Sequence, residues 1–192
     1  MLLVFFQKKF IPIALLIVIF SIIYFFISNI GDPTQKNISN NSHFEMKTAY
    51  LIAPIDEPFI DILSANKKFI ASEVKNIPWS FEQHAYWLKI TIKNKQNEVA
   101  NLVSHFDNPM LDELSIFQVM DTGEVIKQQQ GDLQNIIAFT QRTAPHFKFK
   151  VSPFEETSLY VRIATTGIAN TPIYVYQNDD FRVLVQDIHL LW

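Results

Sequence analysis

Cysteine is absent from this chain, and glycine and charged residues are scarce. Its 192 residues include no cysteine and only four glycines, charged residues make up 18% of the sequence, and the formal net charge is -3. Without cysteine the chain forms no disulfide and no Cys-based zinc or redox site. The negative net charge disfavours a partner with a phosphate backbone, so we expect no nucleic-acid binding. Any folded domain must rely on its apolar core alone.

The motifs of common catalytic sites are missing as well. The chain has no G-x-S-x-G nucleophile elbow, no H-E-x-x-H motif, no P-loop and no G-x-G-x-x-G fingerprint. Its five histidines are scattered, and no two are spaced four residues apart as in a helical metal site. We therefore expect a protein that is not an enzyme and that holds no cofactor or metal ion.

A long uncharged segment stands near the N-terminus. Residues 10–31 carry no charged side chain, and about 22 residues at about 1.5 Å rise cross a hydrocarbon core of about 30 Å. Lys8 and Lys9 precede the segment and Asp32 follows it, which by the positive-inside rule keeps the N-terminus cytoplasmic. No A-x-A cleavage pattern ends the segment. The sequence predicts an uncleaved signal anchor at residues 1–30 in the inner membrane, with the main domain in the periplasm.

Two-residue alternation dominates the chain after Trp79. In the run YWLKITIK at residues 86–93, every second side chain is apolar, which is typical of a strand with one buried face. Further runs of strand type occupy residues 99–106, 113–120, 146–151, 159–163 and 173–176. Short strands without intervening helices predict an all-β, antiparallel jelly-roll β-sandwich.

The sequence divides into four parts. Residues 31–45 are rich in asparagine and serine and predict a linker, and residues 46–182 form the predicted sandwich. Within the first part of the sandwich, residues 59–65 allow one short helical turn. Residues 183–192 become apolar again, which is compatible with a last strand or with the approach to a further membrane helix.

Several short motifs follow one another along the sandwich region. They are Tyr86-Trp87-Leu88-Lys89 with Asn94, Asn108-Pro109-Met110-Leu111-Asp112, Gly131-Asp132, Arg142 and Leu159-Tyr160-Val161-Arg162. Together they resemble the second type of extracellular domain of the bacterial seven-transmembrane receptors with diverse intracellular signalling modules (7TMR-DISM), over residues 60–181. Lys89 departs from the arginine that is common in this family, and lysine lacks the planar fork that pairs with a carboxylate.

The resemblance implies a jelly-roll sandwich similar to carbohydrate-binding modules. It implies that this sandwich senses a periplasmic ligand and signals through a seven-helix membrane unit to a diguanylate cyclase or histidine kinase in full-length relatives.

The polar phase of the predicted strands carries four aromatic rings. These are Trp87, Tyr160, Tyr174 and Tyr176. If the strands share one sheet with a solvent-facing side, the rings can stack on a sugar, with Lys89, Arg162 and His146 donating hydrogen bonds beside them. The alternative is that the rings fill sheet edges or pack beneath residues 46–76.

Charged residues in two predicted loops allow further interpretations. Asp132 and Arg142 can pair across a loop, or Arg142 can face an anionic ligand. His105, Asp107 and the acids at 112–113 can surround a cation, but a solvated turn is the simpler interpretation and the one that we adopt. The candidate ligand-binding residues are Trp87, Lys89, Arg142, Tyr160, Arg162 and Tyr174.

These observations favour a membrane-anchored sensory domain that binds a carbohydrate or another small polar ligand. Two alternatives stay open at this point. The same sandwich can act as a periplasmic protein-interaction or scaffold domain without a small ligand, or as an accessory module of a carbohydrate-active enzyme.

Overall fold

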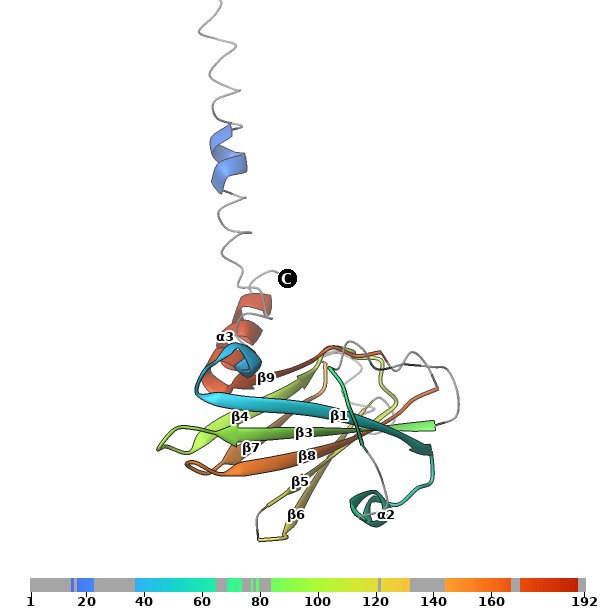
Figure 1. Cartoon of the computed structure of the whole chain (residues 1–192). Helices are drawn as coiled ribbons and strands as arrows, with labels where there is room; N and C mark the ends of the chain where they lie inside the picture. Colours follow the sequence, from blue (N-terminus) through green and yellow to red (C-terminus); the bar gives the residue numbers. More distant parts are fainter. Residues whose placement is uncertain are drawn as a thin grey trace, which may run out of the picture.

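A computed structural model describes most of the chain after residue 36 (Figure 1). The described residues are 15, 17–22, 37–64, 69–73, 77, 79, 84–120, 122–131, 144–166 and 170–189. The predicted N-terminal anchor lies largely outside them, although Leu15 and residues 17–22 are helical and exposed. No helix within the described ranges is both long enough and apolar enough to cross a bilayer.

Short strands make up most of the described structure. They are β1 (Phe44–Pro54), β2 (Ile70–Ala71), β3 (His84–Asn94), β4 (Ala100–Phe106), β5 (Glu113–Val119), β6 (Val125–Gln130), β7 (His146–Val151), β8 (Glu156–Ala164) and β9 (Ile173–Gln177). The helical elements are the 3-10 helix η1 (Ile38–Asn40), α2 (Phe59–Leu63) and α3 (Asn178–His189).

The strands form two sheets. The larger sheet has the order β2-β1-β3-β8-β5-β6, and the smaller one has the order β7-β4-β9. Neighbouring strands pair antiparallel throughout both sheets. Side chains from both sheets belong to one buried cluster, so the sheets pack face to face. The predicted antiparallel β-sandwich is confirmed.

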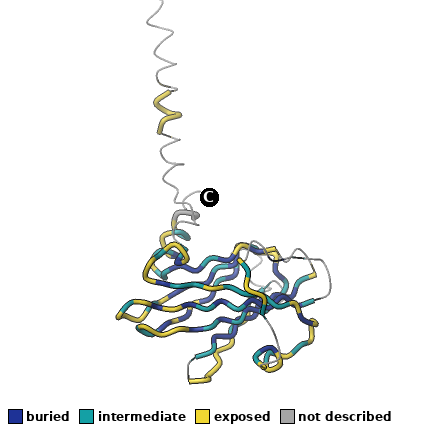
Figure 2. Tube along the Cα trace, in the orientation of Figure 1, coloured by how far each residue is buried: buried dark blue, intermediate teal, exposed yellow. Residues whose placement is uncertain are grey.

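Alternation along β3 places its apolar phase in this core. Tyr86, Leu88, Ile90 and Ile92 are each at most 2% exposed and pack in the cluster between the sheets. Figure 2 shows the buried positions running along the middle of the strands, with exposed positions at the turns. Each aliphatic side chain buried in this way stabilises the fold by about 1.5–3 kcal/mol, so β3 is a principal part of the core.

Both outer faces of the sandwich carry a further apolar cluster. On the larger sheet, Ile62 of α2 packs with Trp87 and Phe117. On the smaller sheet, Phe181 of α3 packs with Tyr176 and Val103. In Figure 1, α2 and α3 lie at opposite ends of the molecule. The polar phase of several strands is therefore covered and does not face solvent.

The folded part begins before residue 46. Ile38 is 1% exposed, and β1 starts at Phe44, which is 5% exposed, so part of the predicted linker belongs to the sandwich. The side-chain oxygen of Asn37 also accepts a hydrogen bond from the backbone N–H of Val175 in β9. Ile38, Phe44 and the Asn37 hydrogen bond thus hold this asparagine-rich segment on the sandwich.

The last described segment is a helix, so the alternative of a final strand is wrong. Residues Asp179 and Asp180 occupy the first turn of α3, where a negative charge favours the helix dipole. Phe181, Leu184 and Val185 are spaced by three and four residues, and all three pack on the smaller sheet. This helical period replaces the alternation that a strand would require.

Candidate functional site

The outer face of the larger sheet brings four of the predicted residues together. Trp87 of β3 lies opposite Arg162 of β8 in the strand register, and Lys89 lies opposite Tyr160. On the far side of β8, Arg162 pairs with Ser115 and Tyr160 pairs with Phe117. Since all of these positions share one phase, their side chains form two adjacent rows across β3, β8 and β5.

Helix α2 covers the centre of these rows with one aromatic ring. The Phe59 ring centroid lies 4.0 Å from that of Phe117, 5.8 Å from that of Trp87 and 5.6 Å from that of Tyr160. The Nζ atom of Lys89 lies 5.5 Å from the Tyr160 ring centroid, which is cation–π distance. The predicted aromatic residues Trp87 and Tyr160 therefore line the underside of α2 and do not form an open platform.

Arg162 is fixed at the edge of this cluster by two acceptors. Its Nη1 atom donates to Oε1 of Glu113 at 2.7 Å, and its Nη2 atom donates to the backbone oxygen of Ile55. The Arg162 side chain is only 15% exposed. A partly buried guanidinium held by a carboxylate and a carbonyl keeps one orientation, so it presents a rigid planar surface to whatever lies beside it.

A cavity of about 360 Å³ opens beside this ion pair. Its lining comes from the β1–α2 loop, from α2 and from the face of β3, β5, β6 and β8: Ile55, Asp56, Glu57, Phe59, Trp87, Glu113, Ser115, Phe117, Lys127 and Arg162. This volume lies at the lower end of the range for small-molecule sites. The cavity thus combines aromatic rings with an oriented ion pair.

The indole N–H of Trp87 is unusual within this cavity wall. Trp87 is 1% exposed, and its Nε1 atom is buried without a hydrogen-bond partner among the described residues. An indole nitrogen is a donor only, and leaving a buried donor unsatisfied costs about 1–3 kcal/mol. Trp87 therefore brings to the cavity wall a buried donor for which the described residues provide no acceptor.

The other predicted site residues lie elsewhere. Tyr174 and Tyr176 belong to β9 of the smaller sheet, where their rings stack at a centroid distance of 5.9 Å. His146 of β7 also lies on that sheet. The four aromatic rings consequently do not form one row, because the two sheets separate them. Arg142, together with Asp132, falls outside the described residues.

Two polar side chains in the loop before β5, Asn108 and Asp112, make hydrogen bonds that stabilise the fold. The Oδ2 atom of Asp112 accepts hydrogen bonds from the backbone N–H of Thr166 at 2.6 Å and from its hydroxyl at 2.8 Å. The backbone N–H bond is the largest of the effects that lower the pKa of Asp112. Asn108 accepts from the backbone N–H of Met110, which closes the turn before β5. No group of three or more metal-ligating side chains occurs among the described residues.

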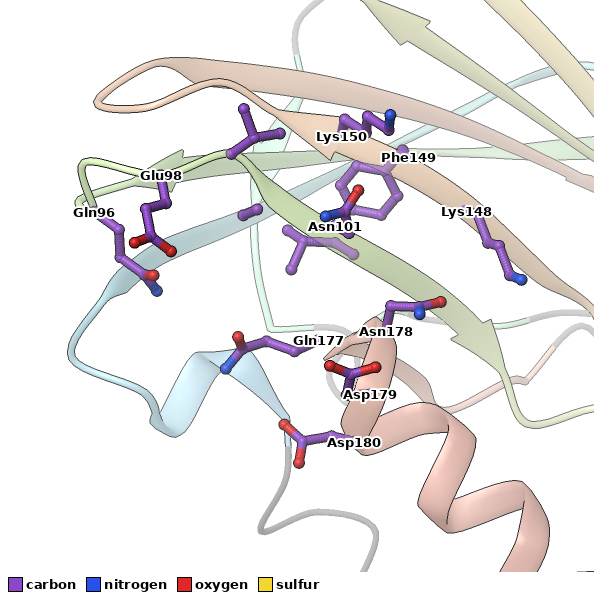
Figure 3. Close-up of a pocket in the computed structure, with 13 residues that line it drawn as sticks. Gln96, Glu98, Asn101, Lys148, Phe149, Lys150, Gln177, Asn178, Asp179 and Asp180 are labelled. Atoms are coloured by element: carbon purple, nitrogen blue, oxygen red, sulfur yellow. The ribbon is translucent and has the colours of Figure 1, made fainter.

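A second cavity, of about 760 Å³, lies where α3 leaves the smaller sheet (Figure 3). Lys148 and Lys150 of β7 and Asp179 and Asp180 of α3 contribute to its lining. None of the candidate ligand-binding residues contributes to it. It is a polar recess lined by side chains of both charge signs.

Three residues of the cavity wall were not predicted from the sequence: Phe59, Phe117 and Lys127. The position of Phe117 could have been predicted from strand alternation, because Glu113, Ser115 and Phe117 lie two residues apart on a predicted strand and share one face. Phe59 carried no such signal, since a five-residue helix has too few residues to show a period. Its role depends on the return of α2 over the sheet.

Comparisons with known proteins complete the description. The family model described as 7TMR-DISM extracellular 2 matches residues 52–177, and no curated protein matches the chain. One similar solved structure is a β-glucosidase from Kluyveromyces marxianus in complex with glucose, with 10% identity and a TM-score of 0.35, covering 76% of this chain and 18% of that chain. Another is TmCBM61 in complex with beta-1,4-galactotriose, with 8% identity and a TM-score of 0.27, covering 75% of this chain and 96% of that chain.

Proposed function

This chain belongs to the 7TMR-DISM extracellular 2 family, and from that membership we propose that it is the periplasmic sensory input domain of a membrane signal-transduction receptor. Residues 1–30 anchor it in the inner membrane, and residues 31–45 lead from the anchor into the sandwich, whose core already includes Ile38 and Phe44. The sandwich predicted over residues 46–182 is of the jelly-roll class. Residues 183–192 lead toward a further membrane helix. In full-length relatives the expected partner is a seven-helix unit with a diguanylate cyclase or histidine kinase output.

The ligand of this domain is a carbohydrate or another small polar molecule, bound in the cavity beside α2. The observation that carries this proposal is the unsatisfied indole N–H of Trp87 in a cavity wall that also holds the Arg162–Glu113 pair. A ligand oxygen would satisfy the buried donor, and a movement of α2 that lifts Phe59 from Phe117 would uncover an apolar ring face for sugar C–H groups. Tyr160, which lies against Phe59, and Lys89, which lies over the Tyr160 ring, pack beside this wall. Arg142 and Tyr174 stay candidates for ligand contacts outside it.

Access to Trp87 requires a movement of α2. This helix has five residues, and its N-cap, Pro58, makes no side-chain hydrogen bond. Ile60 on its outer side is 71% exposed. An element with so few buried contacts opens at low free energy, so α2 can admit a ligand and close over it. Binding then favours one arrangement of the sandwich over another, which is the differential interaction that a signal requires.

Isothermal titration of the full chain in lipid nanodiscs tests the proposal. The probes are a panel of neutral hexoses and their di- and trisaccharides. We expect one of them to bind, and we expect Trp87→Phe to weaken that binding about tenfold or more, because the variant keeps a ring but removes the donor. Trp79→Phe is the matched control, since the Trp79 Nε1 atom is also buried without a partner but does not line the cavity.

Two outcomes would contradict the proposed site. If Trp87→Phe and Trp79→Phe bind the saccharide equally well, the ligand does not use the cavity beside α2. If no saccharide in the panel binds and the chain instead retains a periplasmic protein, the interaction-domain alternative replaces the sensory one.

A further inference from the structure

Helix α3 is held on the smaller sheet by a buried aromatic residue that contacts two histidines. Phe181 is 7% exposed, and its ring centroid lies 5.1 Å from that of His146 and 5.5 Å from that of His105. A third ring, that of Tyr176, lies 5.9 Å away. The helix that leaves the sandwich is thus packed directly against two imidazole side chains.

The two histidines are neighbours in the sheet. His105 of β4 and His146 of β7 are paired in the antiparallel register, so their side chains lie on the same outer face. The His105 side chain is 17% exposed, and its Nδ1 atom is buried without a hydrogen-bond partner among the described residues. The Nδ1 atom of His146 lies 3.4 Å from the backbone oxygen of Ala144.

Only weak compensation for positive charge is visible around this pair. Directly after β4, Asp107 places Oδ1 4.0 Å from Nε2 of His105, at the limit of an ion pair. On β9, the titratable neighbours are Tyr174 and Tyr176. On β7, Lys148 follows His146 on the same face and adds positive charge. From α3, Asp179 and Asp180 border the polar recess beside β7, and Arg182 follows Phe181 in the sequence.

Burial favours the neutral form of His105. Its pKa is lowered chiefly by desolvation and also by His146, while Asp107 acts in the opposite direction. A group whose pKa is lower in the packed state contributes full stability above its unfolded pKa of about 6.5, and this stability is lost as the pH falls below that value. Two adjacent imidazolium ions would also repel each other beneath an apolar ring.

We propose that the packing of Phe181 between His105 and His146 is a proton-sensitive latch that holds α3 on the sandwich and releases it when both histidines become protonated. The released state hydrates the two charges more fully than the packed state does. Because α3 directly follows β9, release changes how firmly the sandwich holds the chain beyond it. This latch lies on the opposite sheet from the proposed ligand cavity and does not depend on it.

Distances between spin labels on the full chain in nanodiscs test the latch. The native sequence has no cysteine, so Lys150→Cys on β7 and Val183→Cys on α3, both at exposed positions, can be labelled selectively. At about pH 8 we expect one narrow distance distribution, and at about pH 5 we expect a longer and broader one to dominate, since these values bracket the ordinary histidine pKa. Phe181→Ala should give the broad distribution at both values.

Neutral replacements separate the latch from general acid unfolding. His105→Gln combined with His146→Gln should keep the narrow distribution at both pH values, whereas the matched control His43→Gln, at an exposed turn position, should keep the transition. The latch is overturned if the labelled native sequence shows the same distribution at both pH values, or if the double variant retains the transition. Should the double variant fail to fold by circular dichroism, each single variant must shift the transition midpoint to lower pH, and an unshifted midpoint in both overturns the latch as well.

Discussion

Gly131 ends β6 at a position where no larger residue fits. Its φ angle is +138°, and a Cβ atom built there would lie 2.4 Å from the backbone oxygen of Asp112. Backbone atoms of the β4–β5 loop cannot move away as a flexible side chain could. The close approach therefore fixes how β6 ends beside the start of β5.

We expect Gly131→Ala to lower the free energy of unfolding by about 1–3 kcal/mol, because it adds both a steric clash and an unfavourable φ. Urea denaturation measures this loss. Gly123→Ala is the matched control: its φ is +83°, but a Cβ atom there would meet nothing within 4 Å. Equal losses in the two variants would show that backbone conformation alone, and not the contact with Asp112, sets the requirement.

Asp112 makes the loop after β8 sensitive to acid. Its carboxylate accepts hydrogen bonds from Thr165 and Thr166, and those from Thr166 lower its pKa below the ordinary value of 3.8. A lowered pKa gives stability that is present above the unfolded value and is lost as the pH falls through the folded value. We expect Asp112→Asn to be less stable than the native chain near neutral pH and to lose less stability below about pH 4. Parallel pH-dependent unfolding curves for the two proteins would refute this role.

At the scale of whole elements, the two sheets are joined along one side by glutamine side chains. Gln130 of β6 donates to the backbone oxygen of His146 at 2.7 Å and accepts from the backbone N–H of the same residue at 3.1 Å. Gln128 donates to the oxygen of Lys148 and Gln118 donates to that of Lys150. Backbone groups at the free edge of β7 are thus satisfied by side chains of the opposite sheet, which protects this edge strand from further pairing.

Gln130→Ala should remove two of these bonds and leave both backbone groups of His146 without their partner. We expect a loss of about 1–3 kcal/mol in unfolding free energy and faster hydrogen exchange at the amide of residue 146. Gln129→Ala is the control, because Gln129 bonds to Ser115 within its own sheet. Unchanged exchange at residue 146 in Gln130→Ala would mean that solvent satisfies the edge of β7 equally well.

Sequence periodicity predicts the elements that bury one face and misses those that do not. β3, β4, β5, β7, β8 and β9 were all predicted near their observed bounds because their apolar phase enters the core. β6 was not predicted, since its sequence VIKQQQ places polar side chains in both phases and leaves most positions exposed. Its place in the fold comes from its pairing with β5 and from its glutamine bonds to β7.

The candidate site was predictable only in part, for a related reason. Phase along a strand correctly separated Trp87 and Arg162 from the core side chains, and the register then placed them side by side. Phase does not reveal which sheet a strand joins, so Tyr174 was grouped with residues of the other sheet. It also does not reveal that Phe59 returns over Trp87, because that contact joins residues far apart in sequence.

At the scale of the whole molecule, the buried apolar side chains form three clusters that hold different parts of the fold together. The cluster between the sheets contains side chains from nearly every strand, and the two outer clusters attach α2 and α3. Loss of the inner cluster removes the contact between the sheets. Loss of an outer cluster leaves that contact in place, so the helices can detach while the sandwich persists.

This hierarchy predicts different consequences for two large-to-small substitutions. Leu159 is fully buried between the sheets, and Leu159→Ala should lower the free energy of global unfolding by about 2–5 kcal/mol. Phe59 is only partly buried, outside the sheets, so Phe59→Ala should cost less globally and should raise hydrogen exchange mainly in residues 59–63. Denaturant curves combined with exchange by mass spectrometry measure both effects. If Phe59→Ala unfolds the sandwich as extensively as Leu159→Ala does, α2 is an integral part of the core, and a ligand could not reach Trp87 by displacing α2 alone.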